Sequence, residues 1–267
     1  MLNLADQRNY GGIISDSTCI IVLTYNKIDV TKQFLTQLFD NTYGNYHLVI
    51  VDNGSTDGTK EYLDKIDRDN VHIISLDYNS GVIDGRNTGY EKSKHLEYDY
   101  LLFLDNDQFV EKEWLDQHIF FMKQGLYDAL GVEAWEMSEN FRPLRIAKTP
   151  TDFYTYVGAG GMLVRKRVVE EIGLFDTGFS PMYFEDPDFY FRCHRRGFHL
   201  GWNPYARITH KPHQTMSIIS QKNKHKYFRK SLKYFREKWK NYSPPICKRI
   251  KMSESLLYEN QCHNHSI

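Results

Sequence analysis

The sequence has few cysteines and no long apolar run. Its four cysteines form no C-x-x-C pair and no closely spaced framework; they are Cys19, Cys193, Cys247 and Cys262. Because small secreted proteins rely on such frameworks, this usage favours a reducing compartment. No stretch approaches the ~18 consecutive apolar residues of a membrane-spanning helix, and the first residues lack the basic and apolar segments of a signal peptide. We therefore expect a cytoplasmic protein.

The sequence also lacks net charge, internal repeats and low-complexity tracts, and its 34 Lys and Arg residues balance 34 Asp and Glu residues. The charge is nevertheless uneven, since residues 221–250 hold eleven Lys and Arg residues and one Glu. A neutral total thus combines an acidic body with a basic C-terminal segment. With 267 residues, 41% of them hydrophobic, the chain can bury the core of one large domain, with or without an appendage.

The first 107 residues alternate apolar runs with helix-like segments. The expected strands cover residues 18–23, 47–51, 71–76 and 100–104, and the expected helices cover 30–39, 59–66 and 82–95. This alternation is typical of βαβ units around a parallel sheet, and strands that are apolar throughout fit a sheet covered on both faces. Since such sheets bind ligands at the carboxyl ends of their strands, the polar loops after the first, second and fourth strands should meet there.

Beyond residue 107 the regular alternation of strands and helices ends. The expected helices cover residues 114–121, 185–196 and 227–239, and the expected strands cover 130–134, 161–164 and 198–202. This mixed half should pack against the first half and complete a cleft.

The fourth strand ends in Asp105-Asn106-Asp107. Because residues i and i+2 point to the same side of a strand, Asp105 and Asp107 can reach into one site. Two neighbouring carboxylates repel each other unless a cation lies beside them, and hard oxygen ligands favour Mg²⁺, Mn²⁺ or Ca²⁺. The pair is suited to a metal–diphosphate complex. An ordinary Asp-Asn-Asp turn explains the motif about as well.

Two other loops offer candidate binding residues. Ser55 and Asp57 are good helix caps, but capping does not account for Asp52, which follows a strand directly and could accept a hydrogen bond from a nucleobase. Residues 79–89 open a helix with three glycines and Arg86. A helix N-terminus favours anions, so Arg86 could contact a phosphate or ribose. A turn followed by a helix with a solvated Arg86 is the alternative, and the spacing is not that of a P-loop.

A second carboxylate cluster is Glu185-Asp186-Pro187. Pro187 suits the first helical position, which would make Asp186 the N-cap. A helix N-terminus stabilises an ionised carboxylate, and an ionised, positioned carboxylate is a usable general base. His210 follows a short strand and is either structural or a further metal ligand. The run Cys262-His263-Asn264-His265 is interpreted as incidental.

These motifs, in this order, resemble glycosyltransferase family 2, the inverting nucleotide-sugar transferases of GT-A fold. The matching stretches are residues 22–26, 51–59, 79–89, 104–107 and 160–206. The resemblance implies a Rossmann-like α/β fold with a mixed, mostly parallel sheet flanked by helices. It implies a GT-A domain over residues 1–215, with a nucleotide-binding half at about 18–107 and an acceptor half at about 108–215. A basic, aromatic helical segment and tail would follow over 216–267.

The resemblance also implies a role for each matched position. The nucleotide and donor would be bound by Thr24, Tyr25, Asn26, Asp52, Asn79, Gly81, Arg86, Asp105 and Asn106. Asp107 and His210 would hold Mn²⁺ or Mg²⁺, and Asp186 would deprotonate the acceptor hydroxyl. Gly160, Gly161 and Glu185 would border the donor sugar and the acceptor. The chain departs from the family in having Gly85-Arg86-Asn87 in place of the commoner Ala-Arg-Asn.

The implied reaction moves a sugar from a nucleotide-diphosphate donor, UDP before dTDP, to a hydroxyl of a surface polysaccharide or lipid-linked glycan. A non-catalytic nucleotide- or glycan-binding module and a nucleotidyltransferase are the alternatives. The presence of both Asp107 and Asp186 argues against the module. A nucleotidyltransferase would carry a Gly-rich, basic phosphate loop near the first strand, which residues 24–27 are not.

Residues 222–240 interleave Lys and Arg with aromatic residues, and Phe228, Leu232, Phe235 and Trp239 have helical spacing. One interpretation is a helix lying on the anionic inner face of a membrane, at ~1 kcal/mol per basic residue. A helix packed on the domain with a solvated basic face is an equal alternative, and binding to the acidic surface of the body is a third. A nucleic-acid partner is not expected, because no nucleic-acid-binding fold accompanies the basic residues.

Overall fold

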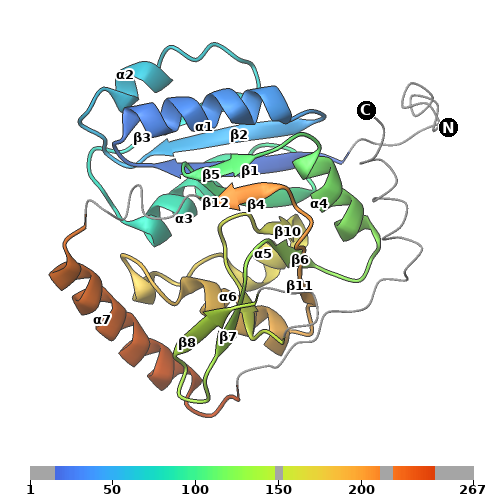
Figure 1. Ribbon diagram of the computed structural model, residues 1–267, viewed down its shortest axis with the longest axis vertical. Coiled ribbons are helices and arrows are strands. Elements are labelled where there is room, and N and C mark those ends of the chain that lie inside the picture. Colours follow the sequence, from blue (N-terminus) through green and yellow to red (C-terminus); the bar gives the residue numbers. More distant parts are fainter. Residues whose placement is uncertain (1–15, 148–152, 211–218, 244–267) are drawn as a thin grey trace.

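The structure is a computed structural model that describes residues 16–147, 153–210 and 219–243. A seven-stranded sheet runs through it in the order β11-β6-β10-β4-β1-β2-β3 (Figure 1). The strands are β1 (Thr18–Thr24), β2 (Tyr46–Asp52), β3 (Val71–Ser75), β4 (Tyr100–Asp105), β6 (Ala129–Gly131), β10 (Leu163–Arg165) and β11 (Leu200–Trp202). β1 is parallel to β2 and β4, β2 to β3 and β6 to β11, whereas β10 is antiparallel to β4 and β6. The predicted mixed, mostly parallel sheet is confirmed.

Helices cover both faces of this sheet, as the apolar strands predicted. They are α1 (Ile28–Asn41), α2 (Thr59–Leu63), α3 (Val82–Ser93), α4 (Trp114–Lys123), α5 (Lys166–Ile172), α6 (Glu185–Arg195) and α7 (Gln221–Trp239), with a 3₁₀ turn η2 (Thr177–Phe179). Alternate strand residues face opposite ways, so Ile20 belongs to a core cluster that includes residues of α1 and α4, while Ile21 belongs to one that includes residues of α3, α5, α6 and α7. Cys19 and Cys193 are buried free thiols.

Two small sheets complete the second half. β5 (Gln108–Val110) is antiparallel to β12 (Ile208–His210), while β7 (Ala134–Met137) pairs with β8 (Pro143–Ile146) and β9 (Tyr156–Val157). The single strand predicted for residues 130–134 is therefore wrong. The chain leaves the large sheet at Gly131 and joins a different sheet at Ala134, and a short apolar run cannot reveal such a change of partner. The intervening turn carries Glu133.

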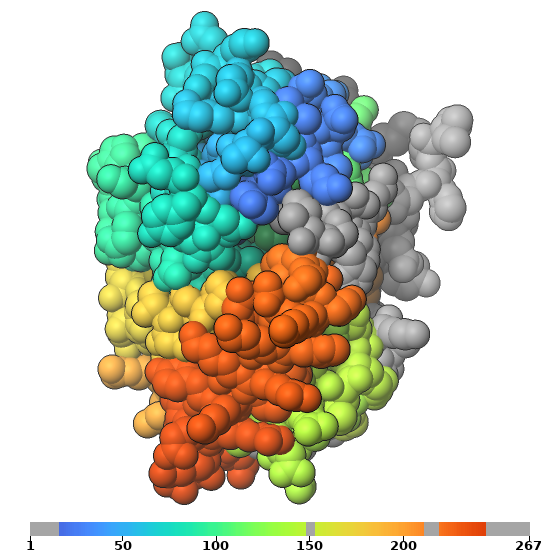
Figure 2. Space-filling model, turned by 90° about the vertical axis from the view of Figure 1, so that its left-hand side faces the viewer, coloured from blue at the N-terminus to red at the C-terminus, as the bar shows by residue number. Residues whose placement is uncertain are grey.

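α7 packs on the domain rather than standing apart. Leu232, Phe235 and Trp239 are buried against the α6 side of the core, and Figures 1 and 2 show the helix lying beside the β7–β8 hairpin. The packed-helix alternative is thus confirmed, and a membrane helix that inserts this apolar face is excluded. Lys238 also pairs with Asp176 and Asp188, so part of the helix does bind acidic groups of the body. In the part of the chain that is described, no helix has the length and apolarity needed to cross a bilayer.

Candidate active site

Asp105 ends β4 and forms an ion pair with a buried arginine. Arg86 Nη2 lies 2.7 Å from Asp105 Oδ1, and the Arg86 side chain is 5% exposed. Burial opposes a charge on Arg86, but Asp105, Asp186 and Glu185 outweigh it and raise the pKa of the guanidinium. The alternative of a solvated Arg86 is therefore wrong. Arg86 brings α3 to the carboxyl edge of the sheet, where three acidic side chains surround it.

Asp107 meets His210 at the same edge. β12 pairs with β5 so that His210 lies opposite Gln108, which places His210 Nε2 3.3 Å from Asp107 Oδ1. The other ring nitrogen, Nδ1, lies 3.2 Å from Glu133 Oε1. Asp107 first and then Glu133 raise the pKa of His210 to about 10. Within the described ranges, no three His, Cys, Asp or Glu side chains gather closely enough to hold a metal ion by themselves.

Asn106, between the two aspartates, turns inward. Its Nδ2 donates to Thr24 Oγ1 at 3.1 Å and to Thr31 Oγ1 at 3.0 Å, and all three side chains are buried. These bonds join the ends of β1 and β4 to α1. Thr24 and Asn106 thus brace the edge of the sheet, and a donor-binding role for either stays a prediction.

The loop after β1 is tied to the loop after β2. Asn26 has a left-handed backbone with φ of 53°, its N–H donates to Ser55 Oγ, and its Oδ1 accepts from the Thr56 N–H. Asp52 lies beside Thr24 in the sheet and is 1% exposed. Its Oδ1 accepts from the Ser55 N–H at 3.1 Å. The predicted nucleoside residues therefore share one hydrogen-bonded corner, with Tyr25 half-buried between them.

A third loop lies next to that corner and is held by Asn53. The side-chain oxygen Oδ1 of Asn53 accepts from the backbone N–H and the hydroxyl of Ser80, and its Nδ2 donates to Asn79 Oδ1 and to the Gly81 carbonyl. Gly81 has a φ of +90°, and a Cβ there would lie 2.6 Å from Pro181. Glycine is therefore required at position 81 both for its backbone angle and for the close approach of Pro181. This loop delivers the N-terminus of α3 to the site.

The predicted cap at the start of α6 is wrong. The helix begins at Glu185, which puts Asp186 inside its first turn and Pro187 third, and the preceding Phe184 has a φ of 70°. Phe184 packs against Phe228 and Phe235 of α7. The helix therefore starts at residue 185 as its pattern predicts, but Phe184 and not Asp186 is its N-cap.

Asp186 also differs from the expected ionised carboxylate. Burial first, and then the neighbouring Glu185, raise the pKa of Asp186 to about 8, and burial raises the pKa of Glu185 as well. Arg86 opposes both effects but does not cancel them. Asp186 Oδ1 and Glu185 Oε2 are shielded from solvent and have no hydrogen-bond partner among the described residues. A pair of carboxyl groups with shielded oxygens and unmet hydrogen-bonding capacity is suited to a ligand that carries hydroxyls.

Two adjacent glycines differ in what they face. A Cβ on Gly160 would lie 3.1 Å from Asp105 Oδ2 and 3.0 Å from the Gln108 side chain, so Gly160 borders the carboxylate edge. Gly161 has a φ of +79°, and a Cβ there would lie 2.5 Å from Val132 in the protein interior. Upstream, a Cβ on Gly158 would lie 3.8 Å from Asp186 Oδ2 and 3.9 Å from the Glu133 carbonyl. Residues 158–160 therefore line both carboxylate clusters.

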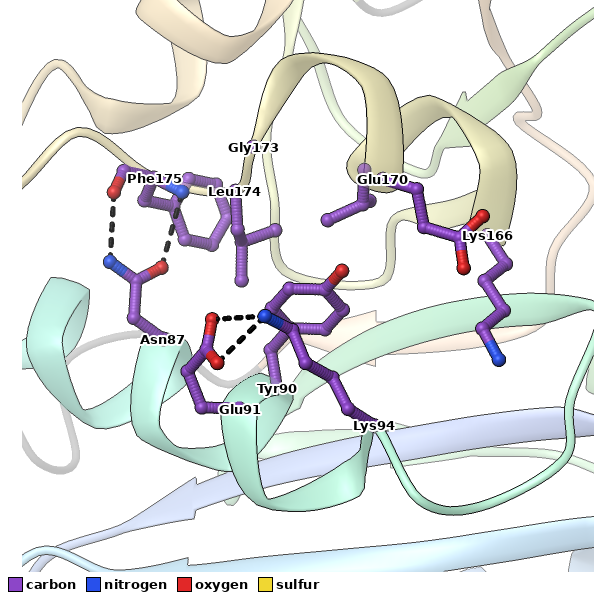
Figure 3. A pocket seen from close by; sticks show the side chains of 10 residues that line it. Asn87, Tyr90, Glu91, Lys94, Lys166, Glu170, Gly173, Leu174 and Phe175 are labelled. Carbon is purple, nitrogen blue, oxygen red and sulfur yellow. Dashed lines mark hydrogen bonds and ion pairs between the residues drawn. The ribbon is translucent and has the colours of Figure 1, made fainter.

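The site is distinct from a groove on the described surface. That groove has a volume of about 670 Å³ and lies between α3 and α5 (Figure 3). Its lining includes the Glu91–Lys94 ion pair and Asn87, whose side chain bonds to the backbone of Phe175. None of the predicted site residues lines it. The site is instead an edge of the sheet at which loops from both halves converge.

Comparison with known proteins identifies the family. The family model of glycosyl transferase family 2 matches residues 19–224. The chain belongs to glycosyl transferase family 2. The match includes every candidate site residue, both carboxylate clusters and the first residues of α7.

Individual relatives of this family 2 chain include proteins named as glycosyltransferases. A Bacillus subtilis protein named as a teichuronic acid biosynthesis glycosyltransferase is 32% identical over 108 residues, covering 39% of this chain and 41% of that protein. Poly-beta-1,6-N-acetyl-D-glucosamine synthase of Staphylococcus aureus is 25% identical over 205 residues, covering 70% and 48%. The chain thus spans less than half the length of either. The crystal structure of GalNAc-T7 with UDP, GalNAc and Mn²⁺ matches 74% of this chain and 44% of its own with a TM-score of 0.62 at 17% identity, which supports the GT-A fold.

Three residues of the site were not predicted. Asn53 holds the loop of residues 79–81, here called the glycine loop. Gln108 accepts a hydrogen bond from the Asp105 N–H, and Glu133 bonds to His210. Asn53 and Gln108 adjoin predicted residues in the sequence, so polar residues next to a strand end were a usable signal. Glu133 interrupts an apolar run. Its contact with His210 depends on the change of sheet at that point, which the sequence does not reveal.

Proposed function

We propose that this family 2 chain transfers a sugar from a nucleoside diphosphate to a hydroxyl group, with inversion and with Asp186 as the general base. The observation that carries the proposal is the Glu185–Asp186 pair beside Arg86, in which Glu185 is buried and Asp186 half-buried, with shielded, unpartnered oxygens and a pKa of about 8 at Asp186. A base is most effective when its pKa lies near the working pH. A surface carboxylate would be a much weaker base.

In the proposed reaction the ionised Asp186 takes the proton of the acceptor hydroxyl. The hydroxyl oxygen forms a bond to the anomeric carbon while the bond from that carbon to the diphosphate oxygen breaks. The diphosphate leaves with the electron pair, and the acceptor ends on the opposite face of the sugar. Gly160 leaves room for the sugar beside Asp105, because a Cβ at this position would lie 3.1 Å from that carboxylate.

Asp107 and His210 would hold Mn²⁺ or Mg²⁺. Their facing atoms are 3.3 Å apart, so both can reach one ion at ~2.1 Å, and such ions commonly take their other ligands from water and substrate phosphates. A divalent cation bound there would offset the charge that builds on the leaving diphosphate. Glu133 on the second ring nitrogen would fix the orientation of His210, as carboxylates do for histidine ligands. The Mn²⁺ bound with UDP in the GalNAc-T7 structure supports a divalent metal.

The corner formed by Tyr25, Asn26 and Asp52 would take the nucleoside, with UDP favoured and dTDP next, and the loop from Asn79 to Gly81 would border the diphosphate. For the acceptor we propose a surface polysaccharide or a lipid-linked glycan. The names of the Bacillus and Staphylococcus relatives support this choice.

The outer face of α7 would contact the anionic inner face of a membrane. Its apolar face is already buried, so this contact would be purely electrostatic, made by exposed basic side chains at Lys222, Lys226, Arg229 and Lys233. Such attraction is screened by salt. Co-sedimentation with vesicles that contain phosphatidylglycerol should fall when the four residues are replaced by alanine or when salt is raised to 1 M. Binding that persists in both conditions would exclude this face as the contact.

The transferase proposal is tested by thermal shift with UDP, dTDP, GDP and CDP, each with and without Mn²⁺. A ligand that binds the native state raises its melting temperature. We expect a Mn²⁺-dependent shift with UDP or dTDP that disappears in Asp107→Ala. That nucleotide then defines the donors for a transfer assay. An absence of any shift would favour a glycan-binding module, and release of pyrophosphate from a nucleoside triphosphate and a sugar phosphate would favour a nucleotidyltransferase.

A further inference from the structure

One stretch of chain touches both proposed halves of the reaction. Residues 173–184, here called the connector, join α5 to α6 and so lead directly to Glu185 and Asp186. On the way, the Pro181 carbonyl accepts a hydrogen bond from the Val82 N–H at 2.9 Å. The connector therefore lies against the N-terminus of α3, next to Gly81. Its position determines where the glycine loop and the first turn of α6 lie relative to each other.

α7 holds the connector from the outside. The Ser231 hydroxyl is fully buried and lies within hydrogen-bond distance of two connector carbonyls, 2.9 Å from Met182 and 3.2 Å from Phe179. Lys230 Nζ lies 2.7 Å from the carbonyl of Ser180, the residue before Pro181. A buried hydroxyl and an ammonium group thus hold the connector on both sides of the contact with α3.

The C-terminal turn of α7 holds α6. Asp188, two residues after Asp186, is fully buried, and its Oδ1 accepts from the indole N–H of Trp239 at 2.9 Å. Lys238 Nζ lies 2.7 Å from the same oxygen, and Arg192 Nε lies 2.8 Å from Oδ2. Two cations and an indole therefore satisfy this buried carboxylate, and two of the three donors come from α7.

We infer that α7 is a positioning element for the transfer reaction, in which Ser231 sets the connector against the glycine loop and Trp239 sets the first turn of α6. This inference rests on the proposed function, because it assigns Asp186 and the glycine loop their roles. Neither Ser231 nor Trp239 touches the proposed site. They act through Pro181 and Asp188, and small errors in placing reacting groups can cost about 100-fold in rate.

The two residues should give different kinetic signatures. Trp239→Phe keeps an aromatic ring but removes the donor to Asp188, so we expect kcat to fall about 10-fold or more with the donor KM nearly unchanged. Ser231→Ala frees the connector beside Gly81, so we expect the donor KM to rise about 10-fold with a smaller effect on kcat. Glu237→Gln is the control, because Glu237 is exposed on the same helix and pairs with Lys240. It should match the wild type.

Hydrogen exchange provides a second measurement that does not depend on activity. In Ser231→Ala we expect faster exchange of amides in residues 79–86 and 176–190, with β1 and β2 unchanged. A variant that merely weakened the fold would instead speed exchange in β1 and β2 as well. Equal acceleration everywhere, or kinetics and exchange identical to the control, would overturn the inference. A wild type without transfer activity would reject the proposed function, while the exchange comparison would still decide whether α7 sets these two segments.

Discussion

Two pairs of carboxylates in the site differ in how their charges are satisfied: the first cluster is Asp107 and Glu133 beside His210, and the second is Glu185 and Asp186. Asp107 and Glu133 each face a nitrogen of His210, so protein partners already meet that cluster's hydrogen bonds. Asp186 and Glu185 instead each keep a shielded oxygen without a partner in the described structure. Each cluster raises the pKa of one group. The raised pKa of His210 favours its positively charged form, whereas the raised pKa of Asp186 favours its neutral form.

This difference indicates which ligand each cluster suits. In the first cluster one imidazole lies between two carboxylates. A metal ion can replace a proton there without leaving any of these groups without a partner. A shielded carboxyl oxygen without a partner is costly until a ligand supplies a hydrogen-bond donor. The first cluster thus suits an ion, and the second suits the hydroxyls of a sugar.

The strongest test of the comparison removes the charge of the second cluster alone. Asp186→Asn keeps the shape of the side chain but cannot accept the acceptor's proton, so we expect transfer to fall about 10²–10⁴-fold. Nucleotide binding should stay within about threefold of wild type, because the nucleoside corner is formed by other loops. Steady-state transfer and calorimetric titration with UDP or dTDP and Mn²⁺ measure the two quantities. Full activity in this variant would remove Asp186 from the mechanism.

A smaller effect is expected at the first cluster. Glu133→Gln removes the carboxylate behind His210, and loss of such a partner typically weakens metal affinity about 10–100-fold. Mn²⁺ affinity is measured by titration in the presence of the nucleotide. The matched control is Glu136→Gln, because Glu136 lies on β7 and pairs with Arg145 away from His210. If the two variants bind Mn²⁺ equally well, Glu133 does not orient a metal ligand.

The sequence predicted the first half of the molecule more fully than the second. Apolar strands with polar ends locate Asp52 and Asp105 at one edge of a parallel sheet by topology alone, and both lie there. Arg86 was placed at the start of the correct helix. Its burial was not predictable, because burial depends on the distant Asp105, Glu185 and Asp186 that surround it.

The second half depends on contacts that local patterns do not encode. The turn at Glu133 follows from a change of sheet, and the N-cap of α6 is the left-handed Phe184, which packs on α7. The amphipathic pattern of α7 predicted a helix with one apolar face, yet the same pattern suits a membrane or a protein core. The burial of Leu232, Phe235 and Trp239 against the core decides between them.

The smallest expected effect is on stability, and its sign follows from the raised pKa of Asp186. The folded state holds this proton up to about pH 8, whereas an unfolded aspartate releases it near its ordinary pKa of 3.8. The folded state therefore binds more protons across that window, and stability falls as pH rises through it. Asp186→Asn avoids this loss, so its advantage over wild type should grow from pH 4 to pH 8 and then level off.

We expect that advantage to reach about 1–2 kcal/mol, well below the full value of the shift, because water and neighbouring groups rearrange around a buried charge. In a chain of this size it corresponds to a few degrees in melting temperature. The measurement is a pair of melting curves across pH in metal-free buffer without donor, and Glu139→Gln, at an exposed position, should follow the wild type. A constant offset between Asp186→Asn and wild type at all pH values would mean that the pKa of Asp186 is the same in the folded and unfolded states. The second cluster would then resemble the first in having its charge satisfied, and the contrast between them would fail.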